Sequence, residues 1–328
     1  MPALLLGATI VVVLLLVACW WLTMRMPGKR FRGELPSPTE SEIALGDQLR
    51  RDVETLALRI GERNIPREPN MRRTVDWLEE QLSSAGHSPR RCPYTYQGRS
   101  WDNLEVELPG SGLSDDILVV GAHYDSVIGS PGANDNGSGC AALLELARHF
   151  TVSPGSGTLR LVFFANEEPP TFLREGMGSF AYARACRERG ETVTGMISLE
   201  TIGTYFDEPG SQSYPFPLSL FYPSTGNFIA FVGNLRSRPL LHRSIAAFRQ
   251  TASVPSEGGA LPEMLPGVGW SDHWSFWRFG YPAIMITDTA LFRDSTYHTP
   301  LDLPDHLDYQ RFALVVEGLK GMIEELRA

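Results

Sequence analysis

Apolar runs and amphipathic segments alternate along the middle of this 328-residue chain. Nearly continuous apolar runs at 117–125, 159–167 and 192–200 predict buried strands, and the segments between them, 137–150 and 178–190, predict helices. Strands that are apolar on both faces are typical of a sheet covered by helices on both sides. The pattern therefore predicts an α/β fold.

The same patterning predicts elements on either side of this centre. Apolar residues recur every three or four positions across 41–64, which predicts a helix, and a second helix is expected from about 70 to 85. Two strands are expected at 88–97 and 103–108. The remaining expected elements are strands near 218–222, 228–233 and 283–287, and helices at 237–250 and 306–327. The stretches 207–214 and 255–269 are expected to be loops.

The N-terminal region has a different character. Residues 3–23 carry no charge, and this segment is long enough to cross a bilayer as a helix. Trp20 and Trp21 would then lie at the membrane interface. A cleaved signal peptide and a lipoprotein signal ending at Cys19 are the alternatives. Both normally begin with a basic segment, which this chain lacks. We therefore expect residues 1–24 to be a single-pass transmembrane anchor, followed by a linker at 25–40 and one large domain at 41–328.

The charges that follow the expected anchor bear on its orientation. They are Arg25, Lys29, Arg30 and Arg32. The positive-inside rule would place such a cluster, and with it the large domain, on the cytoplasmic side.

Overall composition excludes some classes of function. The formal net charge is -9, and a protein that follows a phosphate backbone needs a basic face, so we expect no nucleic-acid partner. The four cysteines are Cys19, Cys92, Cys140 and Cys186. They form no CxxC motif and do not predict a disulfide framework, although the sequence is compatible with a single disulfide bridge.

Acidic and imidazole side chains gather where the expected strands end. The residues are His123, Asp125, Asp135, Glu167, Glu168, Glu200 and His298. The carboxyl ends of strands in open α/β sheets form the usual crevice for chemistry. Imidazole nitrogen and carboxylate oxygen are the ligands that zinc takes in catalytic sites. Two histidines and three carboxylates could hold two ions if one carboxylate bridges, which leaves one carboxylate as a general base.

Each of these residues also has an ordinary structural explanation. A histidine at a strand end is often only hydrogen-bonded, and Asn134-Asp135-Asn136-Gly137 is typical of a turn with a helix cap. An adjacent acidic pair usually lies on a solvated face. Glu167 and Glu168, however, follow an apolar strand, where like charges require a compensating cation or proton. Their joint occurrence in this order favours a metal site.

Five segments carry a resemblance to a known family. GAHYDSV, PGANDNGSGCAALLELAR, FFANEE, ISLETIG and YHTPLD resemble the M28 family of zinc peptidases, which includes bacterial aminopeptidases. The resemblance covers about Asp52 to the C-terminus. It implies a mixed, mostly parallel sheet of about eight strands flanked by helices. It also implies two zinc ions per chain, peptide substrates with a free N-terminus and a cis peptide at Asp135–Asn136. An extracytoplasmic domain is implied as well, in conflict with the charges after the anchor.

The resemblance also implies a ligand set. His123 resembles a ligand of the first zinc, with Asp125 orienting its ring. Asp135 resembles the bridging carboxylate, and Glu168 and His298 resemble ligands of the second zinc. The third ligand of the first zinc is commonly Asp in this family, and this chain has Glu200 there. Glutamate has the same donor atoms, so we expect it to bind, with an effect on occupancy or metal preference left open.

Catalytic roles follow from the same resemblance. Glu167 resembles the general base that moves a proton from water to the leaving amine. Tyr297 is placed either to stabilise the oxyanion or to pack against the sheet edge. Asp272 and His273 resemble a segment at the mouth of the site. The neighbouring aromatics form either core or a side-chain pocket, and they are Trp270, Trp274, Phe276 and Trp277.

The expected activity is that of an aminopeptidase. Glutaminyl cyclases share the fold but tend to lose the two-metal ligand set, which is complete here. Carboxypeptidase or dipeptidase activity and a non-catalytic binding ectodomain remain alternatives. The sequence leaves the oligomeric state and the preferred N-terminal residue open.

Overall fold

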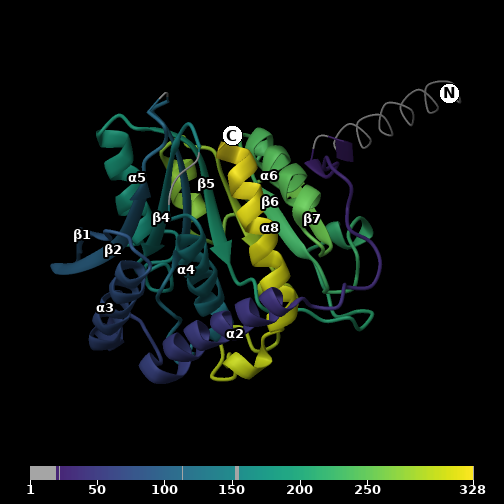
Figure 1. Cartoon of the computed structure of the whole chain (residues 1–328), viewed down its shortest axis with the longest axis horizontal. Helices are drawn as coiled ribbons and strands as arrows, with labels where there is room; N and C mark the ends of the chain where they lie inside the picture. The colour runs from purple at the N-terminus through teal and green to yellow at the C-terminus, as the bar shows by residue number, and fades with distance from the viewer. Residues whose placement is uncertain (1–19, 22, 113, 152–154, 328) are drawn as a thin grey trace, which may run out of the picture.

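A single mixed sheet of eight strands organises the chain, in the order β1-β2-β4-β3-β5-β8-β6-β7 (Figure 1). The computed structural model describes residues 20–327 except for 22, 113 and 152–154. The strands are β1 (Arg90–Tyr96), β2 (Arg99–Leu108), β3 (Asp116–His123), β4 (Thr158–Phe164), β5 (Thr192–Glu200), β6 (Ile229–Gly233), β7 (Ser256–Ala260) and β8 (Ala283–Thr287). The pairs β3–β4, β3–β5, β5–β8 and β6–β7 are parallel. The predicted α/β fold with about eight strands is confirmed.

Helices cover both faces of this sheet. They are α2 (Glu40–Glu54), α3 (Glu68–Ser84), α4 (Gly139–His149), α5 (Gly178–Glu188), α6 (Arg238–Thr251), α7 (His273–Arg278) and α8 (Tyr309–Arg327). One apolar core joins α2, α3, α4, α6 and α8 to the sheet face that Figure 1 presents to the viewer. A second core on the opposite face contains α5, α7 and residues of the surrounding loops.

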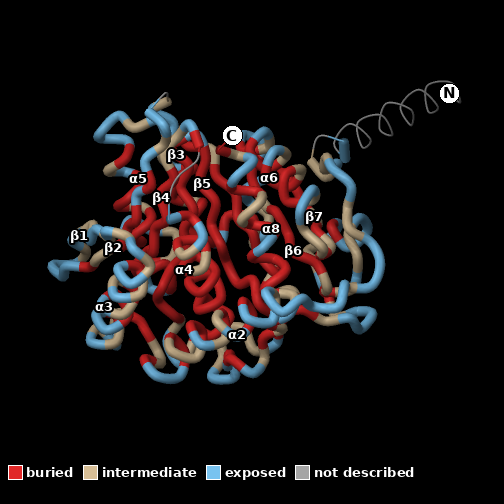
Figure 2. Tube along the Cα trace, in the orientation of Figure 1, coloured by how far each residue is buried: buried red, intermediate tan, exposed pale blue. Residues whose placement is uncertain are grey.

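Strand β3 shows why the central runs are apolar throughout. Leu118 and Val120 belong to the first core, whereas Ile117 and Val119 belong to the second. Successive side chains of a strand point to opposite faces, so a strand with helices on both sides needs apolar residues at every position. Figure 2 shows the resulting buried sheet, with exposure confined mainly to helix surfaces and loops.

Two expectations for the C-terminal half were wrong. The strand expected near 218–222 is a short 3-10 turn, Leu218–Leu220, in a segment with prolines at 215, 217 and 223. Proline has no N–H to donate to a ladder, which disfavours a strand there. The loop expected at 255–269 instead contains β7, because Ser256–Ala260 pairs with β6 although its sequence, SEGGA, has low strand propensity. The short helix α7 was also not predicted.

The segment that precedes α2 packs against the domain. Met26 and Leu35 contact the first core, and the Arg249 guanidinium donates to the carbonyl of Pro27 over 2.9 Å. This segment runs beside β7, the last strand of the sheet, and so covers an edge that would otherwise expose unpaired backbone groups.

The transmembrane prediction falls largely outside the described part of the chain. Residues 1–19 and 22 of the expected anchor are not described. Within the residues that are described, no helix is both long and apolar enough to cross a bilayer.

The core packing yields a stability prediction. Phe231 on β6 is fully buried and packs edge-on against Phe248 of α6, with ring centroids 5.2 Å apart. Phe231→Ala should lower the free energy of unfolding by about 3–5 kcal/mol, because it removes apolar burial and leaves a cavity. Urea denaturation would measure this loss. Leu220→Ala is the control, since Leu220 is 70% exposed and its replacement should change the midpoint little.

Candidate metal centre

The sheet brings the predicted ligands to one edge. His123 ends β3 and Glu200 ends β5, while Glu167 and Glu168 follow β4. Asp135 lies in the irregular turn η3 (Ala133–Ser138), which leads into α4. His298 lies in the loop that follows β8. Because β3, β4 and β5 are parallel neighbours, their carboxyl ends meet at the same edge.

The ligand atoms form two groups that share Asp135. In the first group, His123 Nε2 lies 3.3 Å from Asp135 Oδ1 and 3.2 Å from Glu200 Oε2. In the second, His298 Nε2 lies 3.0 Å from Asp135 Oδ2 and 3.3 Å from Glu168 Oε1. The two oxygens of one carboxylate therefore face two different imidazoles. The peptide bond Asp135–Asn136 is cis, as the family resemblance implied.

The electrostatics of this cluster call for positive charge. Burial alone would lower the pKa of His298, but the carboxylates of Asp135 and Glu168 raise it to about 10. Burial and the neighbouring Asp135 charge raise the pKa of Glu168 to about 8. Among the described residues, no donor hydrogen-bonds to the buried Asp135 Oδ1 or Glu168 Oε1. Such carboxylate oxygens, beside imidazole rings that can give up a proton to a metal, fit the donor set that zinc prefers.

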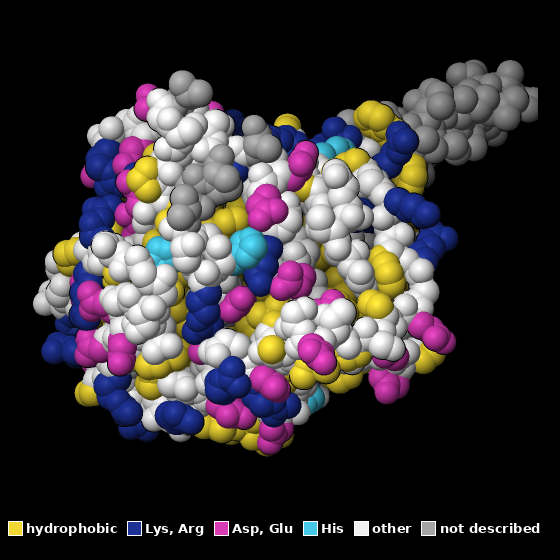
Figure 3. Space-filling model, viewed as in Figure 1, with side chains coloured by type: hydrophobic (Ala, Val, Ile, Leu, Met, Phe, Trp, Pro, Cys, Tyr) yellow, Lys and Arg dark blue, Asp and Glu magenta, His cyan; other side chains and the backbone are white. Residues whose placement is uncertain are grey.

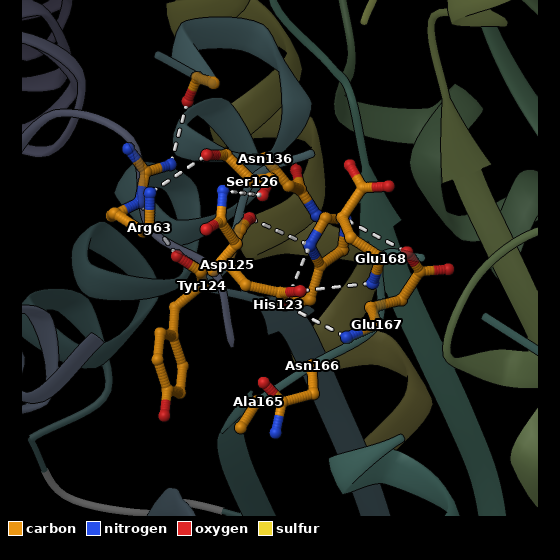
Figure 4. Close-up of polar contacts among 12 residues, drawn as sticks. Arg63, His123, Tyr124, Asp125, Ser126, Asn136, Ala165, Asn166, Glu167 and Glu168 are labelled. Carbon is orange, nitrogen blue, oxygen red and sulfur yellow. Dashed lines mark hydrogen bonds and ion pairs between the residues drawn. The ribbon is translucent and has the colours of Figure 1, made fainter. Parts of the chain in front are cut away.

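Asp125 holds three parts of the centre together (Figure 4). Its Oδ1 accepts from the backbone N–H of Glu167 over 3.0 Å, and its Oδ2 accepts from that of Glu168 over 3.1 Å. His123 Nδ1 lies 3.5 Å from Asp125 Oδ1 and 3.2 Å from the carbonyl oxygen of the same residue. The side chain thus faces the His123 ring, as predicted, and also fixes the backbone of the acidic pair, which was not predicted.

Two further carboxylates hold the turn that carries Asp135. Asp302 accepts from the backbone N–H groups of Asn134 and Asp135 over 2.7 and 3.1 Å. Asp288 accepts from the side-chain amide of Asn134 over 2.9 Å. The sequence interpretation missed both functions. Asp302 lies in the quoted motif YHTPLD, which marks the segment, but a contact 167 residues away leaves no local signal.

Arg63 was also missed. It is fully buried, and its guanidinium donates to backbone carbonyls at 2.7–3.1 Å rather than to a carboxylate. The carbonyls belong to Leu56, Gly61, Tyr124, Pro131 and Gly132. Figure 4 shows it beside the segment of Tyr124 and Asp125. This single side chain therefore fastens the end of β3 to the loop before η3.

Glu167 and Glu200 have different surroundings. Burial raises the pKa of Glu167 well above its usual range, although the His123 charge opposes this, and its Oε2 lies 3.9 Å from His123 Nε2. Glu200 Oε2 accepts from the Ser271 hydroxyl over 2.7 Å, which orients the longer side chain. Glu167 adjoins the first ligand group without belonging to either group.

The remaining predicted residues lie around the centre. Tyr297 stacks on His298 with ring centroids 3.8 Å apart. Burial raises the pKa of Asp272 to about 7, while the His123 charge lowers it, so Asp272 is within electrostatic reach of the first group. His273 instead has Nε2 at 2.8 Å from the carbonyl of Val268 and packs edge-on against Trp277. Burial lowers the pKa of His273 to about 4.

An apolar pocket opens beside Glu200 and Tyr297, with about 830 Å³ of empty space when the adjoining open solvent is included. It lies on the second face of the sheet, over β8, β6 and β7. Trp270 lines it, whereas Phe276 and Trp277 belong to the second core. The aromatic segment therefore contributes to both the pocket and the core.

Comparisons with known proteins bear on this site. A family model described as Peptidase family M28 matches residues 103–320. The uncharacterized protein YfbL of Escherichia coli is 36% identical over 292 residues, which cover 86% of this chain and 88% of that protein. Leucine aminopeptidase 1 of Arthroderma otae is 25% identical over 278 residues, which cover 78% of this chain and 67% of that protein.

Solved structures share the fold. A zinc aminopeptidase from Bacillus subtilis superimposes with a TM-score of 0.67 at 15% identity, covering 90% of this chain and 96% of that chain. A glutaminyl cyclase from Fimbriiglobus ruber has a TM-score of 0.63 at 21% identity, covering 92% and 99%. At these identities the likeness concerns the fold alone.

The support of the Asp135 turn gives a prediction about zinc affinity. Asp302→Asn should weaken zinc binding by roughly 10- to 100-fold, because its amide replaces an acceptor of two backbone N–H groups. Competition with a chromophoric chelator would measure the change. Asp305→Asn is the matched control, since the Asp305 side chain is 94% exposed and forms an ion pair with Arg50 at the surface. An Asp302 variant with unchanged zinc affinity would show that the turn keeps its conformation without these two hydrogen bonds.

Proposed function

We propose that this chain, which belongs to peptidase family M28 and is a zinc metallopeptidase, acts as an aminopeptidase. We further propose that it holds two zinc ions per chain. The observation that carries the proposal is the pair of ligand groups joined by Asp135. One His and one further carboxylate complete each group, so the donor set is that of two neighbouring catalytic zinc sites.

The proposed ligands divide between the two groups. His123 and Glu200 would hold one ion, Glu168 and His298 would hold the other, and Asp135 would bridge them. Zinc bound there would supply a Lewis acid to the scissile carbonyl and a lowered pKa to water. Asp125 contributes by holding the His123 ring and the Glu167–Glu168 backbone in fixed positions.

Glu167 is the proposed general base. Its carboxylate lies beside the first group but is not needed to complete it. Burial raises its pKa towards the range in which a carboxylate can accept a proton from water and return it to a leaving amine. Tyr297 adjoins the same centre and is the proposed donor to the developing oxyanion.

The surroundings support substrates with a free amino terminus. The centre is rich in buried carboxylates, and a carboxylate whose charge bound zinc does not fully neutralise would attract the ammonium group of a free amino terminus. The apolar pocket beside Glu200 is placed to receive the first side chain of the peptide. Membrane attachment through residues 1–24 belongs to the proposal on the basis of the sequence, and an extracytoplasmic domain belongs to it on the basis of the family resemblance, against the charges that follow the anchor.

The role of Glu167 can be tested by one substitution. Glu167→Gln should lower kcat for a leucyl anilide by roughly 100- to 10,000-fold, because the amide cannot accept a proton. The zinc content should stay unchanged, since Glu167 belongs to neither ligand group. Glu175→Gln is the control, because Glu175 lies in the same loop but is exposed. The N-acetylated anilide should not be cleaved by either variant. Cleavage of the acetylated compound at a similar rate would contradict the aminopeptidase proposal.

The pKa shifts predict proton release when zinc binds. Before zinc binds, His298 with a pKa of about 10 and Glu168 with a pKa of about 8 are largely protonated at pH 7. Ligand atoms must be deprotonated, so zinc affinity should rise as the pH is raised from 6 towards 9. Titration calorimetry at pH 7 in two buffers of different ionisation enthalpy should give different apparent enthalpies. Identical enthalpies would mean that no proton leaves.

A further inference from the structure

We infer that Arg30, on the segment that follows the predicted anchor, sets the side-chain preference of the pocket by neutralising Glu257 at its far end. With Arg30 in place, the pocket takes long, unbranched apolar side chains and rejects basic ones. The inference rests on the proposed aminopeptidase function, because it concerns the first side chain of the substrate.

The strand register connects the metal centre to Glu257. Glu200 of β5 pairs with Thr287 of β8, Thr287 pairs with Ala230 of β6, and Ala230 pairs with Glu257 of β7. Directly paired residues point to the same face of a sheet, so all four side chains lie on the pocket side. Three strand spacings separate the Cα atoms of Glu200 and Glu257 by roughly 14 Å.

The residues between the two carboxylates leave room along this row. Thr287 and Ala230 have small side chains, and both line the pocket together with Glu200 and Glu257. Larger apolar residues surround them, among them Phe228, Trp270, Leu291 and Phe292. The pocket is therefore an apolar trough that begins at the metal centre and has an acid at its far end. Such a trough fits an extended chain of methylene groups.

Glu257 has one ion-pair partner among the described residues, Arg30. The Glu257 side chain is 14% exposed and that of Arg30 is 31% exposed, so the pair is largely removed from water. The nearby tyrosine hydroxyls donate elsewhere, Tyr222 to the carbonyl of Gly258 and Tyr214 to that of Pro223. Arg30 is thus the cation in direct contact with the acid, while Arg249 acts on it only through its more distant charge.

The chain around Arg30 is fastened to the domain. Arg249 donates to the carbonyl of Pro27, and Met26 packs where Gly258 has no side chain. Figure 1 shows this segment passing on the outer side of β7, and Figure 3 shows basic side chains along its course at the right of the molecule. Arg30 is therefore held against the pocket by neighbours on both the sheet and α6.

Removal of Arg30 should expose a charge. A largely buried carboxylate that loses its partner is destabilised unless it takes up a proton or another cation replaces the partner. The ammonium group of an N-terminal lysine, carried on a four-carbon stem, could take that place at the end of the trough. Norleucine has the same stem without the ammonium group, so the two residues form a matched pair of probes.

The test compares norleucyl and lysyl anilides in the zinc-loaded full-length protein. Arg30→Ala should raise the ratio of kcat/KM for lysyl over norleucyl substrate by about tenfold or more. Arg30→Ala/Glu257→Gln should return the ratio to the wild-type value, because no charge is left to recognise. Lys29→Ala is the matched control, since it removes an exposed neighbouring cation and should leave the ratio unchanged.

A second readout separates this inference from the proposed function. The rise in melting temperature caused by free norleucine or lysine, each added to the zinc-loaded variants, reports side-chain binding without catalysis. If the wild-type protein cleaves no anilide, the proposed function fails. The inference is still supported if norleucine raises the melting temperature of the wild-type protein more than lysine does, and lysine raises that of Arg30→Ala more than norleucine does. An Arg30→Ala protein with wild-type kinetic ratio or wild-type ligand preference overturns it.

Discussion

The site depends on compensation of negative charge at one edge of the sheet. Asp135, Glu167, Glu168 and Glu200 are all buried there, and two imidazoles face them. Like charges at this density are unfavourable in a low-dielectric environment unless cations or protons are bound. Before metal binds, bound protons compensate the negative charge, as the pKa of about 10 for His298 indicates. Zinc can replace those protons, which couples the folding of this edge to metal binding.

The rest of the fold can be understood as the means of holding these groups in place. Parallel strands deliver His123 and Glu200 side by side, while Asp125 and Asp302 accept backbone N–H groups on either side of the centre. Acceptors of this kind fix loops that no regular secondary structure constrains. The far end of the pocket has its own charge balance, between Glu257 and Arg30, so the same principle operates at both ends of the trough.

The sequence predicted the central elements and identified the candidate ligand residues that the fold brings together, because those signals are local. The apolar run at β3 and the acids that follow β4 can be recognised within a few positions. Strand β7 could not be predicted, because SEGGA becomes a strand only through its pairing with β6. The roles of Asp302 and Arg63 were missed for the same reason, since the site segments they fasten lie more than 60 residues away in the sequence. The hydrogen bond from Ser271 to Glu200 was not predicted either, because only the fold brings these two residues together.

The most direct measurement of the shared-carboxylate arrangement is anomalous diffraction at the zinc edge from zinc-loaded crystals. We expect two peaks about 3.5–4 Å apart with the Asp135 carboxylate between them. His123 and Glu200 should lie on one side, and Glu168 and His298 on the other. A single peak, or two peaks that Asp135 does not bridge, would contradict a two-zinc centre built from these residues.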